Sequence, residues 1–577
     1  MKKHRQLRTL VKATWIPFTL AASLLPPAWA QTPPTGGTLL QQTQPRLADP
    51  QPGGNVLPSP ELRPAMAAVP GLKVTPTGFR ITGNTVYPEA ELLAQIQEFI
   101  GKEADFAALN EAATKVRAYY RARGYFLAQA YLPRQEIRSG SIEITVIEGR
   151  LGETKLDLAN ESRISAALAQ GVIDAHLRPG DLITEEGLER PLLILSDLPG
   201  TQVSSTISPS ATLGAADLGI KVEGRGDLVT GSVEADNYGN RFTGTYRLTG
   251  SMSINSPFGL GDLFSASAIT SYGDFNFGRV AYILPVGPYG TRVGISYALF
   301  DYALGKDFEA LQAHGKGDVV SIYALHPFIR TRNANLIGQF AYEKKNLDDF
   351  VDSTTSVENR KIDTLRLGAV GDFRDGLAGG GLNSFGFTFT FGELDIGPAL
   401  VLTNDQGVAG LKTAGSFSKF NYEFRRLQKI NDDTNLLLSL TGQWASKNLA
   451  SAEKFSLGGT AGVRAYPTGE ASGDSGLVVT AELRYIVPEF KLLGGDLTIA
   501  GFVDYGEIRT DKEPLAASAP TNRRSIAGYG IGLTLGKAGD FLIRSSLAVP
   551  TNRDNLPLSD PARSGQPRFW LQGIKWF

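Results

Sequence analysis

Few side chains in this sequence have the types and spacing that catalysis or metal binding requires. The histidines are His4, His176, His314 and His326, and they fall in separate regions of the chain. A metal site of the H-E-x-x-H kind needs two histidines on one helical face, which this spacing does not provide. Residues 473–476 (Gly-Asp-Ser-Gly) are similar to a serine nucleophile motif, but no histidine context accompanies them. We therefore expect no enzymatic activity, no metal and no cofactor.

The most informative charged residues are Arg464 and Asp504. Arg464 lies in a segment from about residue 449 to 476, which separates two alternating stretches and is too long for a hairpin turn. In the following stretch, Asp504 and Phe502 lie on the face opposite to the apolar Val503. If these stretches are strands of a water-filled β-barrel, a carboxylate that faces inward is ordinary. The sharper hypothesis is an Arg464–Asp504 ion pair that tethers a loop folded back into a pore, with Phe502 beside it on the wall.

The first thirty residues read as a targeting segment. A positively charged start (Lys2, Lys3, Arg5, Arg8) precedes a short apolar core, and Ala28-Trp29-Ala30 gives a small-x-small cleavage pattern. We predict a signal peptide over residues 1–30. The chain has no cysteine, which suits an exported protein that folds without disulfides. Its formal charge of -1 gives no indication of a nucleic-acid partner.

After Gly226 the sequence becomes a long series of alternating apolar and polar stretches separated by turn residues. One example is residues 385–391, where phenylalanine alternates with glycine and threonine. A soluble sandwich fits each stretch alone. However, the pattern continues for about 350 residues with charges on the polar face, as in a lipid-embedded barrel of ~9–11 residues per strand. We count about sixteen stretches and predict a 16-stranded antiparallel transmembrane β-barrel over residues 226–577.

The region before the barrel divides into a linker and two αβ units. Residues 31–76 are rich in Pro, Gly and Gln and read as a linker, in which residues 37–44 form either a short helix or part of a disordered stretch. Residues 77–150 predict a strand, two helices and two strands, and residues 151–225 repeat that order.

This order of parts resembles the two-partner secretion transporters, also called TpsB or haemolysin secretion/activation proteins. Residues 124–133 (GYFLAQAYLP) and 142–149 (IEITVIEG) are similar to the family's first POTRA domain, a small periplasmic αβ unit. Residues 462–467 (GVRAYP), followed by Gly473-Asp474, are similar to the signature of the sixth barrel loop. The resemblance covers nearly the whole mature chain. It implies a mixed fold, with two periplasmic α+β POTRA domains ahead of the barrel. It also implies that residues 31–76 are a periplasmic linker, in which residues 37–44 are the candidate for a short plug helix.

The resemblance assigns roles to particular residues. Val463, Arg464, Ala465 and Tyr466 would form the pore-loop motif, with Arg464 as the invariant arginine and Asp504 as its partner. Ala465 departs from the usual glycine, which puts the turn in question because alanine tolerates positive φ less well. Phe577 fits the terminal assembly signal, whereas Lys575 on the same strand face weakens it.

The function implied is export of a partner protein across the outer membrane without ATP. The POTRA domains would hold the partner's N-terminal domain by β-strand addition. The sheet expected to receive it comprises 125–132 and 142–146, with the recognition residues Tyr125, Phe126, Tyr131, Ile142 and Ile144. Other expected partners are outer-membrane lipid and lipopolysaccharide, and the barrel-assembly machinery during biogenesis.

Other functions remain to be compared with export. A barrel-assembly or insertase relative would share the barrel and the Arg464 loop, but usually has more POTRA units than the two counted here. A passive porin needs no periplasmic αβ repeat, so residues 79–224 argue against it. An autotransporter enzyme would need a catalytic passenger, for which these units are too small.

Overall fold

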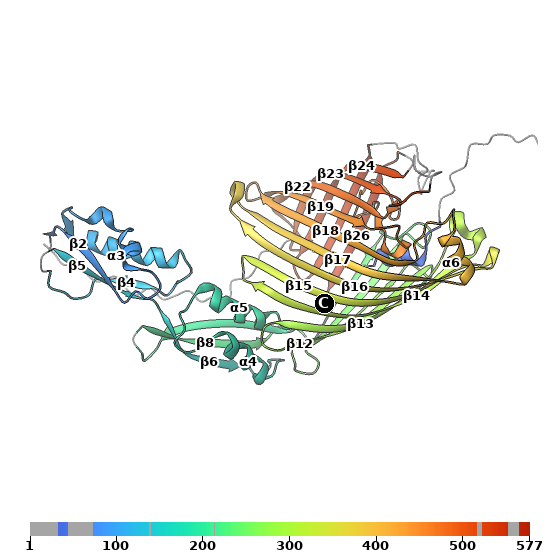
Figure 1. Cartoon of the computed structure of the whole chain (residues 1–577). Coiled ribbons are helices and arrows are strands. Elements are labelled where there is room, and N and C mark those ends of the chain that lie inside the picture. The colour runs from blue at the N-terminus through green and yellow to red at the C-terminus, as the bar shows by residue number, and fades with distance from the viewer. Residues whose placement is uncertain (1–32, 44–72, 138–139, 213, 516–521, 552–564) are drawn as a thin grey trace, which may run out of the picture. The chain divides into compact units, whose positions relative to one another are not determined.

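The computed structural model of this chain describes residues 33–43, 73–137, 140–212, 214–515, 522–551 and 565–577 (Figure 1). The predicted signal peptide (1–30) and most of the predicted linker (31–76) lie outside the described residues. None of the helices in the described ranges is both long and apolar enough to cross a membrane.

The first αβ unit contains a three-stranded sheet in the order β2–β5–β4. Its elements are β1 (Lys73–Val74), β2 (Gly78–Thr82), α2 (Glu89–Leu93), η1 (Gln97–Phe99), β3 (Ala104–Asp105), α3 (Phe106–Arg121), β4 (Gln129–Tyr131) and β5 (Ser141–Ile147). Helix α3 begins after Asp105, whose carboxylate accepts the Ala108 N–H at 2.9 Å. Strand β5 runs parallel to β2 and antiparallel to β4, so it is the central strand and its alternate apolar residues fill the core.

Two predicted elements of this unit differ in the structure. The single helix expected over residues 88–100 is split into α2 and η1, because the backbone at Ile96 (φ -126°, ψ 11°) leaves the α-helical region. The strand expected over residues 125–132 is reduced to β4. Its first part forms a turn instead, closed by a hydrogen bond from the Ala128 N–H to the Tyr125 carbonyl (3.0 Å). The edge strand on this side of the sheet is therefore shorter than the sequence predicts.

The second αβ unit repeats the topology of the first. It consists of β6 (Arg150–Leu158), α4 (Ala166–His176), α5 (Glu185–Ser196), β7 (Thr201–Pro209) and β8 (Ala215–Gly224). Its sheet has the order β6–β8–β7, again with a parallel and an antiparallel pair. The Ser165 and Thr184 hydroxyls accept N–H groups at the starts of α4 and α5, which explains where both helices begin.

The remaining strands close into one antiparallel barrel (Figure 1), as predicted. They are β9 (Val229–Asp236), β10 (Arg247–Asn255), β11 (Leu263–Thr270), β12 (Phe275–Val286), β13 (Thr291–Ala303), β14 (Ala313–Arg330), β15 (Ala334–Val351), β16 (Ser356–Asp375), β17 (Gly381–Gly397), β18 (Gly415–Lys429), β19 (Thr434–Ala445), β22 (Ser475–Leu492), β23 (Gly495–Arg509), β24 (Arg523–Lys537), β25 (Phe541–Pro550) and β26 (Arg568–Trp576). Strand β26 pairs with β9 and completes the ring of sixteen.

Short elements join or line these strands. They are η2 (Lys306–Leu311), η3 (Asp352–Thr354), η4 (Leu377–Gly379), α6 (Ala399–Gln406), η5 (Ser451–Glu453), β20 (Phe455–Ser456) and β21 (Ser472–Gly473). The last three belong to the long segment 449–476, which we call the pore loop.

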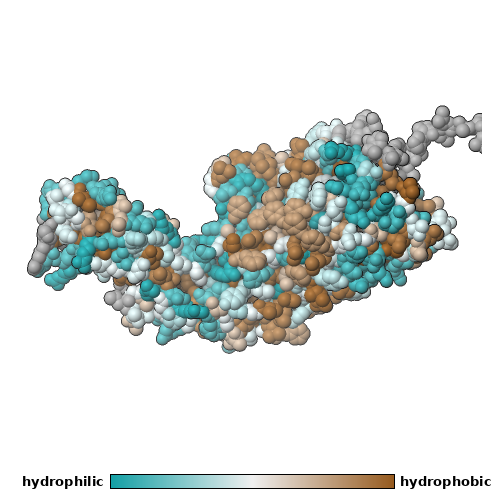
Figure 2. All heavy atoms as spheres, viewed as in Figure 1, coloured by the Kyte–Doolittle hydropathy of each residue, from teal (hydrophilic) through white to brown (hydrophobic). Residues whose placement is uncertain are grey.

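Strand alternation separates an apolar outer face from a polar inner face. On β13, the odd-numbered Ile295, Tyr297 and Leu299 are exposed, whereas the even-numbered Phe300 and Tyr302 are buried. Figure 2 shows hydrophobic side chains gathered over the outside of the barrel strands. This is the arrangement that a barrel in lipid requires.

A short helix, α1 (Gly36–Gln41), lies inside the barrel. Its Leu39 and Leu40 are buried in a cluster that includes the inward-facing Phe300 and Tyr302. The Gly36 N–H donates to the Asp349 carboxylate of β15 at 2.9 Å. The sequence left residues 37–44 open between a short helix and a disordered stretch, and in the structure the helix covers Gly36–Gln41 and lies in the lumen (dark blue in Figure 1).

Candidate functional site

The pore loop folds back into the barrel and packs against its wall. Val463, Ala465 and Tyr466 are buried together with Leu457 of the loop and Phe502 of β23. The loop turns tightly where the Val463 N–H donates to the Leu457 carbonyl at 2.7 Å. A Cβ at Gly462 would lie 1.7 Å from that carbonyl oxygen, so only glycine fits there. This turn presents Arg464 to the wall.

Arg464 contacts Asp504 of β23 through three hydrogen bonds. Its Nε donates to Asp504 Oδ2 at 2.9 Å, its Nη2 donates to Oδ1 at 2.9 Å, and its backbone N–H donates to Oδ2 at 3.1 Å. Asp504 is fully buried and faces inward, as strand parity predicts. The guanidinium carbon lies 3.3 Å from the centroid of the Phe502 ring, which places Phe502 beside the pair. Such a bidentate contact fixes both distance and orientation.

Three further wall residues complete this contact, and the sequence reasoning did not single them out. Arg464 Nη1 donates to Glu482 of β22 at 2.5 Å, and the Thr480 hydroxyl donates to Asp504 at 2.9 Å. Trp570 of β26 donates its indole N–H to the Arg464 carbonyl at 2.7 Å. Glu482 and Thr480 lie on the inward face of an alternating stretch, so parity and the β22–β23 register would have located them. Trp570 carried no such signal, because its position depends on barrel closure.

Ala465 does not need the left-handed backbone that a glycine would allow. Ala465 is not one of the described residues whose φ angle is positive. Its methyl group instead packs on Gly528 of β24, where an added Cβ would lie 2.4 Å from it. The departure from the family pattern is therefore accommodated by a glycine on the wall.

Comparison with known proteins identifies the family. The family described as haemolysin secretion/activation protein ShlB/FhaC/HecB matches residues 214–535, more than half of the chain. A POTRA domain of the ShlB type matches residues 74–149. The chain belongs to the ShlB/FhaC/HecB family. It is an outer-membrane transporter of the two-partner secretion type with periplasmic POTRA domains, and it is not an enzyme.

Curated relatives match over most or all of their length. The heme/hemopexin transporter protein HuxB of Haemophilus influenzae strain 86-028NP is 28% identical over 100% of both chains. The outer membrane transporter CdiB of Dickeya dadantii is 23% identical over 89% of each, and the hemolysin transporter protein ShlB of Serratia marcescens is 23% identical over 79% of each. The solved structure of CdiB from Escherichia coli has a TM-score of 0.68 at 22% identity, covering 91% of this chain and 94% of that one, and supports the fold.

The residues predicted to recognise the partner lie at different depths in the first POTRA domain. Ile142 and Ile144 belong to β5, which is paired on both sides and buried, so an incoming strand cannot add there. Tyr125 packs into the core of the first POTRA domain, and Phe126 packs against the core of the second αβ unit. Tyr131 of β4 is 40% exposed. The alternating pattern marked the best-buried strand rather than the open edge.

The chain terminus closes the barrel. Phe577 and Gly231 of β9 exchange backbone hydrogen bonds of 3.0 and 2.9 Å, and the Phe577 ring lies over Gly231, where a Cβ would meet it at 2.6 Å. Lys575, which shares the Phe577 face, forms an ion pair with Asp540 in the turn before β25. The unusual lysine is thus neutralised at the barrel rim.

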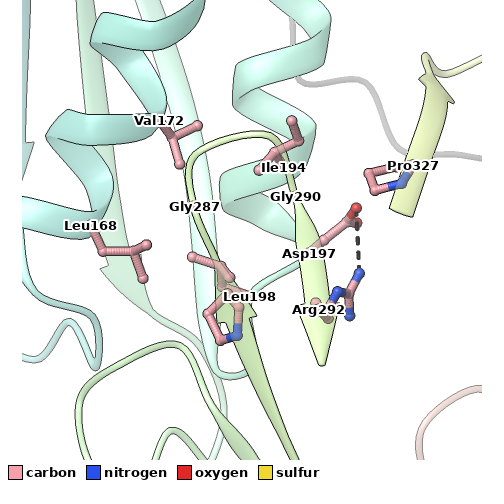
Figure 3. A pocket seen from close by; sticks show the side chains of 10 residues that line it. Leu168, Val172, Ile194, Asp197, Leu198, Gly287, Gly290, Arg292 and Pro327 are labelled. Atoms are coloured by element: carbon pink, nitrogen blue, oxygen red, sulfur yellow. Dashed lines mark ion pairs between the residues drawn. The ribbon is translucent and has the colours of Figure 1, made fainter. Parts of the chain in front are cut away.

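The second αβ unit contacts the barrel through an apolar seam bordered by charges (Figure 3). Leu168 and Val172 of α4 and Ile194 of α5 face the turn that contains Gly287 and Gly290. Asp197, directly after α5, accepts two hydrogen bonds of 2.7 Å from Arg330 of β14. Arg190 of α5 donates to the Pro327 and Phe328 carbonyls at 2.8 and 3.0 Å. These contacts hold the unit to the barrel turns.

Glu148 directly follows β5 in the first POTRA domain, and its carboxylate is buried. Its Oε1 accepts the Thr85 N–H (2.6 Å), the Val86 N–H (2.8 Å) and the Tyr120 hydroxyl (2.9 Å). Burial by itself would raise the pKa of Glu148, but these hydrogen bonds together hold that pKa below its usual value. Burial, followed by the hydrogen bond to the same carboxylate, raises the pKa of Tyr120.

We expect Glu148→Gln to weaken this domain selectively at neutral pH. A carboxyl with a lowered folded-state pKa stabilises above its unfolded-state pKa, and this contribution is lost as the pH falls. The variant should lose about 1–3 kcal/mol of local stability at neutral pH and less in acid. Hydrogen-exchange protection of residues 77–150 in the full-length protein, at neutral and acid pH, measures this. The exposed Glu111→Gln serves as control, and equal protection in both variants at neutral pH would contradict the assignment.

Proposed function

We propose that this transporter captures an extended N-terminal segment of a secreted exoprotein on its first POTRA domain and passes it through the barrel lumen. The main support for passage through the barrel comes from the segments that fill its lumen. The pore loop and α1 occupy it, and both are held by side-chain contacts rather than by barrel strand pairing. Such contacts can be broken and remade without opening the barrel wall.

In this proposal α1 is a plug helix that closes the resting pore, and the pore loop stays anchored through Arg464. The cargo is an unfolded chain, which needs no ATP in the periplasm if folding on the outside makes the movement irreversible. The curated relatives carry names for heme/hemopexin and for hemolysin, so one barrel type serves different exoproteins.

The open edges of the first POTRA domain are the proposed receptor. Within the described residues, β2 and β4 each pair only with β5, so no strand pairs with their outer edges. An extended peptide can add to such an edge through main-chain hydrogen bonds. The Ile81 N–H of β2 already donates to the Glu89 carboxylate at 2.8 Å, so this edge is partly occupied in the resting domain.

Photo-crosslinking tests the receptor assignment. A benzoylphenylalanine at the exposed Arg80 of β2 or at Tyr131 of β4 should crosslink the N-terminal domain of the partner exoprotein. The same group at Glu111, exposed on α3, should not. Equal crosslinking at Glu111 would contradict binding at the sheet edges. Deleting residues 77–150 should abolish secretion and leave a heat-modifiable barrel, and continued secretion would contradict any receptor role.

A further inference from the structure

A second buried ion-pair cluster fixes the pore loop at Glu453, eleven residues before Arg464. Glu453 of η5 pairs with Lys345 of β15 at 2.6 Å and with Lys419 of β18 at 2.8 Å. All three residues come from separate elements, and the side chains of Glu453 and Lys345 are 3% and 5% exposed. We call them the Glu453 cluster. Buried charges are costly unless paired, so this contact strongly specifies where η5 lies.

The main chain of η5 is fixed by the same wall. Lys419 Nζ donates to the Glu453 carbonyl at 3.0 Å, and Gln443 of β19 donates to it at 2.9 Å. Gln443 also donates to the Asp474 carbonyl at 3.0 Å, near the other end of the loop. The position of η5 is therefore set by inward side chains of β15, β18 and β19, none of which contacts Arg464 in the contacts described above.

The plug helix docks on this fixed turn. The Thr35 hydroxyl donates to Ser451 Oγ at 2.7 Å, and Gln41 Nε2 donates to the Ser451 carbonyl at 2.8 Å and also contacts the Lys454 carbonyl. Gly37 lies so close to Ala452 that an added Cβ would be 2.5 Å from its backbone nitrogen. Both ends of α1 therefore contact residues 451–454. The N-terminal end also contacts Asp349 of β15.

We propose that Glu453 is a positioning residue for the plug helix: Lys345 and Lys419 hold it so that residues 451–454 form the docking surface of α1. This rests on the proposed plug function of α1. Arg464 and Glu453 are then anchors of the pore loop with different tasks. Arg464 holds the loop tip to β22 and β23, whereas Glu453 controls closure of the resting pore.

The test uses a disulfide between α1 and η5 in the full-length protein. Because the chain has no cysteine, Thr35→Cys with Ser451→Cys gives a crosslink that reports docking. Adding Glu453→Gln should lower the yield of this crosslink about tenfold, as expected for loss of a charge-assisted hydrogen bond. The same substitution in the cysteine-free chain should raise the open-channel fraction in planar lipid bilayers. Glu453→Asp should restore part of both readouts.

The matched control is Glu343→Gln. Glu343 pairs with Lys345 (3.4 Å) and Arg366 (2.8 Å) on the wall but does not belong to the loop, so docking should persist. Unchanged crosslinking and a closed channel in Glu453→Gln would overturn the inference. If Glu453→Gln fails to assemble, the second variant is Lys419→Met, which keeps the Lys345–Glu453 pair. It should likewise lower the crosslink yield and raise the open-channel fraction, and no change in either would overturn the inference. Deleting residues 33–43 separates the proposals: a channel that stays closed without α1 contradicts the plug function itself.

Discussion

Replacing Arg464 or Asp504 with alanine is expected to reduce secretion by more than tenfold, and replacing both is expected to be little worse than either. The reason is that the two side chains form one unit. Arg464→Ala leaves the buried Asp504 without a cation, at a cost of about 3–5 kcal/mol in a dry interior and less in a wet lumen, and Asp504→Ala leaves Arg464 with Glu482 as its remaining carboxylate and without its bidentate contact to β23. The double substitution removes both charges and so adds little further loss.

The measurement is secretion of the partner exoprotein, alongside heat-modifiability as a check that the barrel has assembled. Arg464→Lys should restore only part of the activity, because an ammonium group cannot reproduce the two parallel hydrogen bonds to Asp504. Losses that add in the double variant would mean that the residues act separately. The tether would then be excluded.

The barrel offers a closely matched control for this experiment. Arg247 of β10 pairs with Asp236 of β9 at 2.9 Å, and its side-chain exposure (14% and 0%) resembles that of Arg464 and Asp504 (15% and 1%). Both partners of this control pair belong to the wall, and their side chains bind each other and the Tyr238 N–H rather than the pore loop. If secretion falls equally in Arg247→Ala, the loss reflects wall stability rather than loop position.

The sequence was sufficient to locate Asp504, and the reason is geometric. A strand alternates strictly, so one apolar neighbour such as Val503 determines that Asp504 faces the lumen. The same rule does not locate a free sheet edge. Ile142 and Ile144 alternate well because β5 is central and buried, and a central strand has no free edge. Periodicity reports burial, while edge position depends on pairing between strands distant in the chain.

The position of α1 and the Glu453 cluster could not be derived from the sequence. Residues 37–44 have helical character, but their location depends on contacts with Asp349 and Ser451, more than 300 residues later in the chain. Glu453 lies in a loop without periodicity, so no face could be assigned to it. Long-range contacts between a loop and a barrel wall leave no local pattern in either segment.

Gly37→Ala is expected to open the resting channel, although alanine favours the helix itself. Alanine stabilises a helix over glycine by about 0.5–1 kcal/mol, so loss of helicity cannot explain an open pore. The added Cβ would lie 2.5 Å from the Ala452 nitrogen and 2.6 Å from Ser451 Oγ, and the Glu453 cluster prevents that turn from retreating. The helix must therefore leave its docking surface.

Conductance of the purified full-length protein in planar lipid bilayers measures this release, with the deletion of residues 33–43 as the fully open reference. Gly36→Ala should have a smaller effect, because its Cβ would meet only side-chain atoms, at 3.1 to 3.3 Å. Gly250→Ala, where the structure leaves open space around the added methyl group, is the control for a glycine change in the barrel. The expected order of open-channel fraction is therefore Gly37→Ala, then Gly36→Ala, then Gly250→Ala at the wild-type level. A Gly37→Ala channel as closed as Gly250→Ala would show that α1 does not close the pore by packing against Ala452.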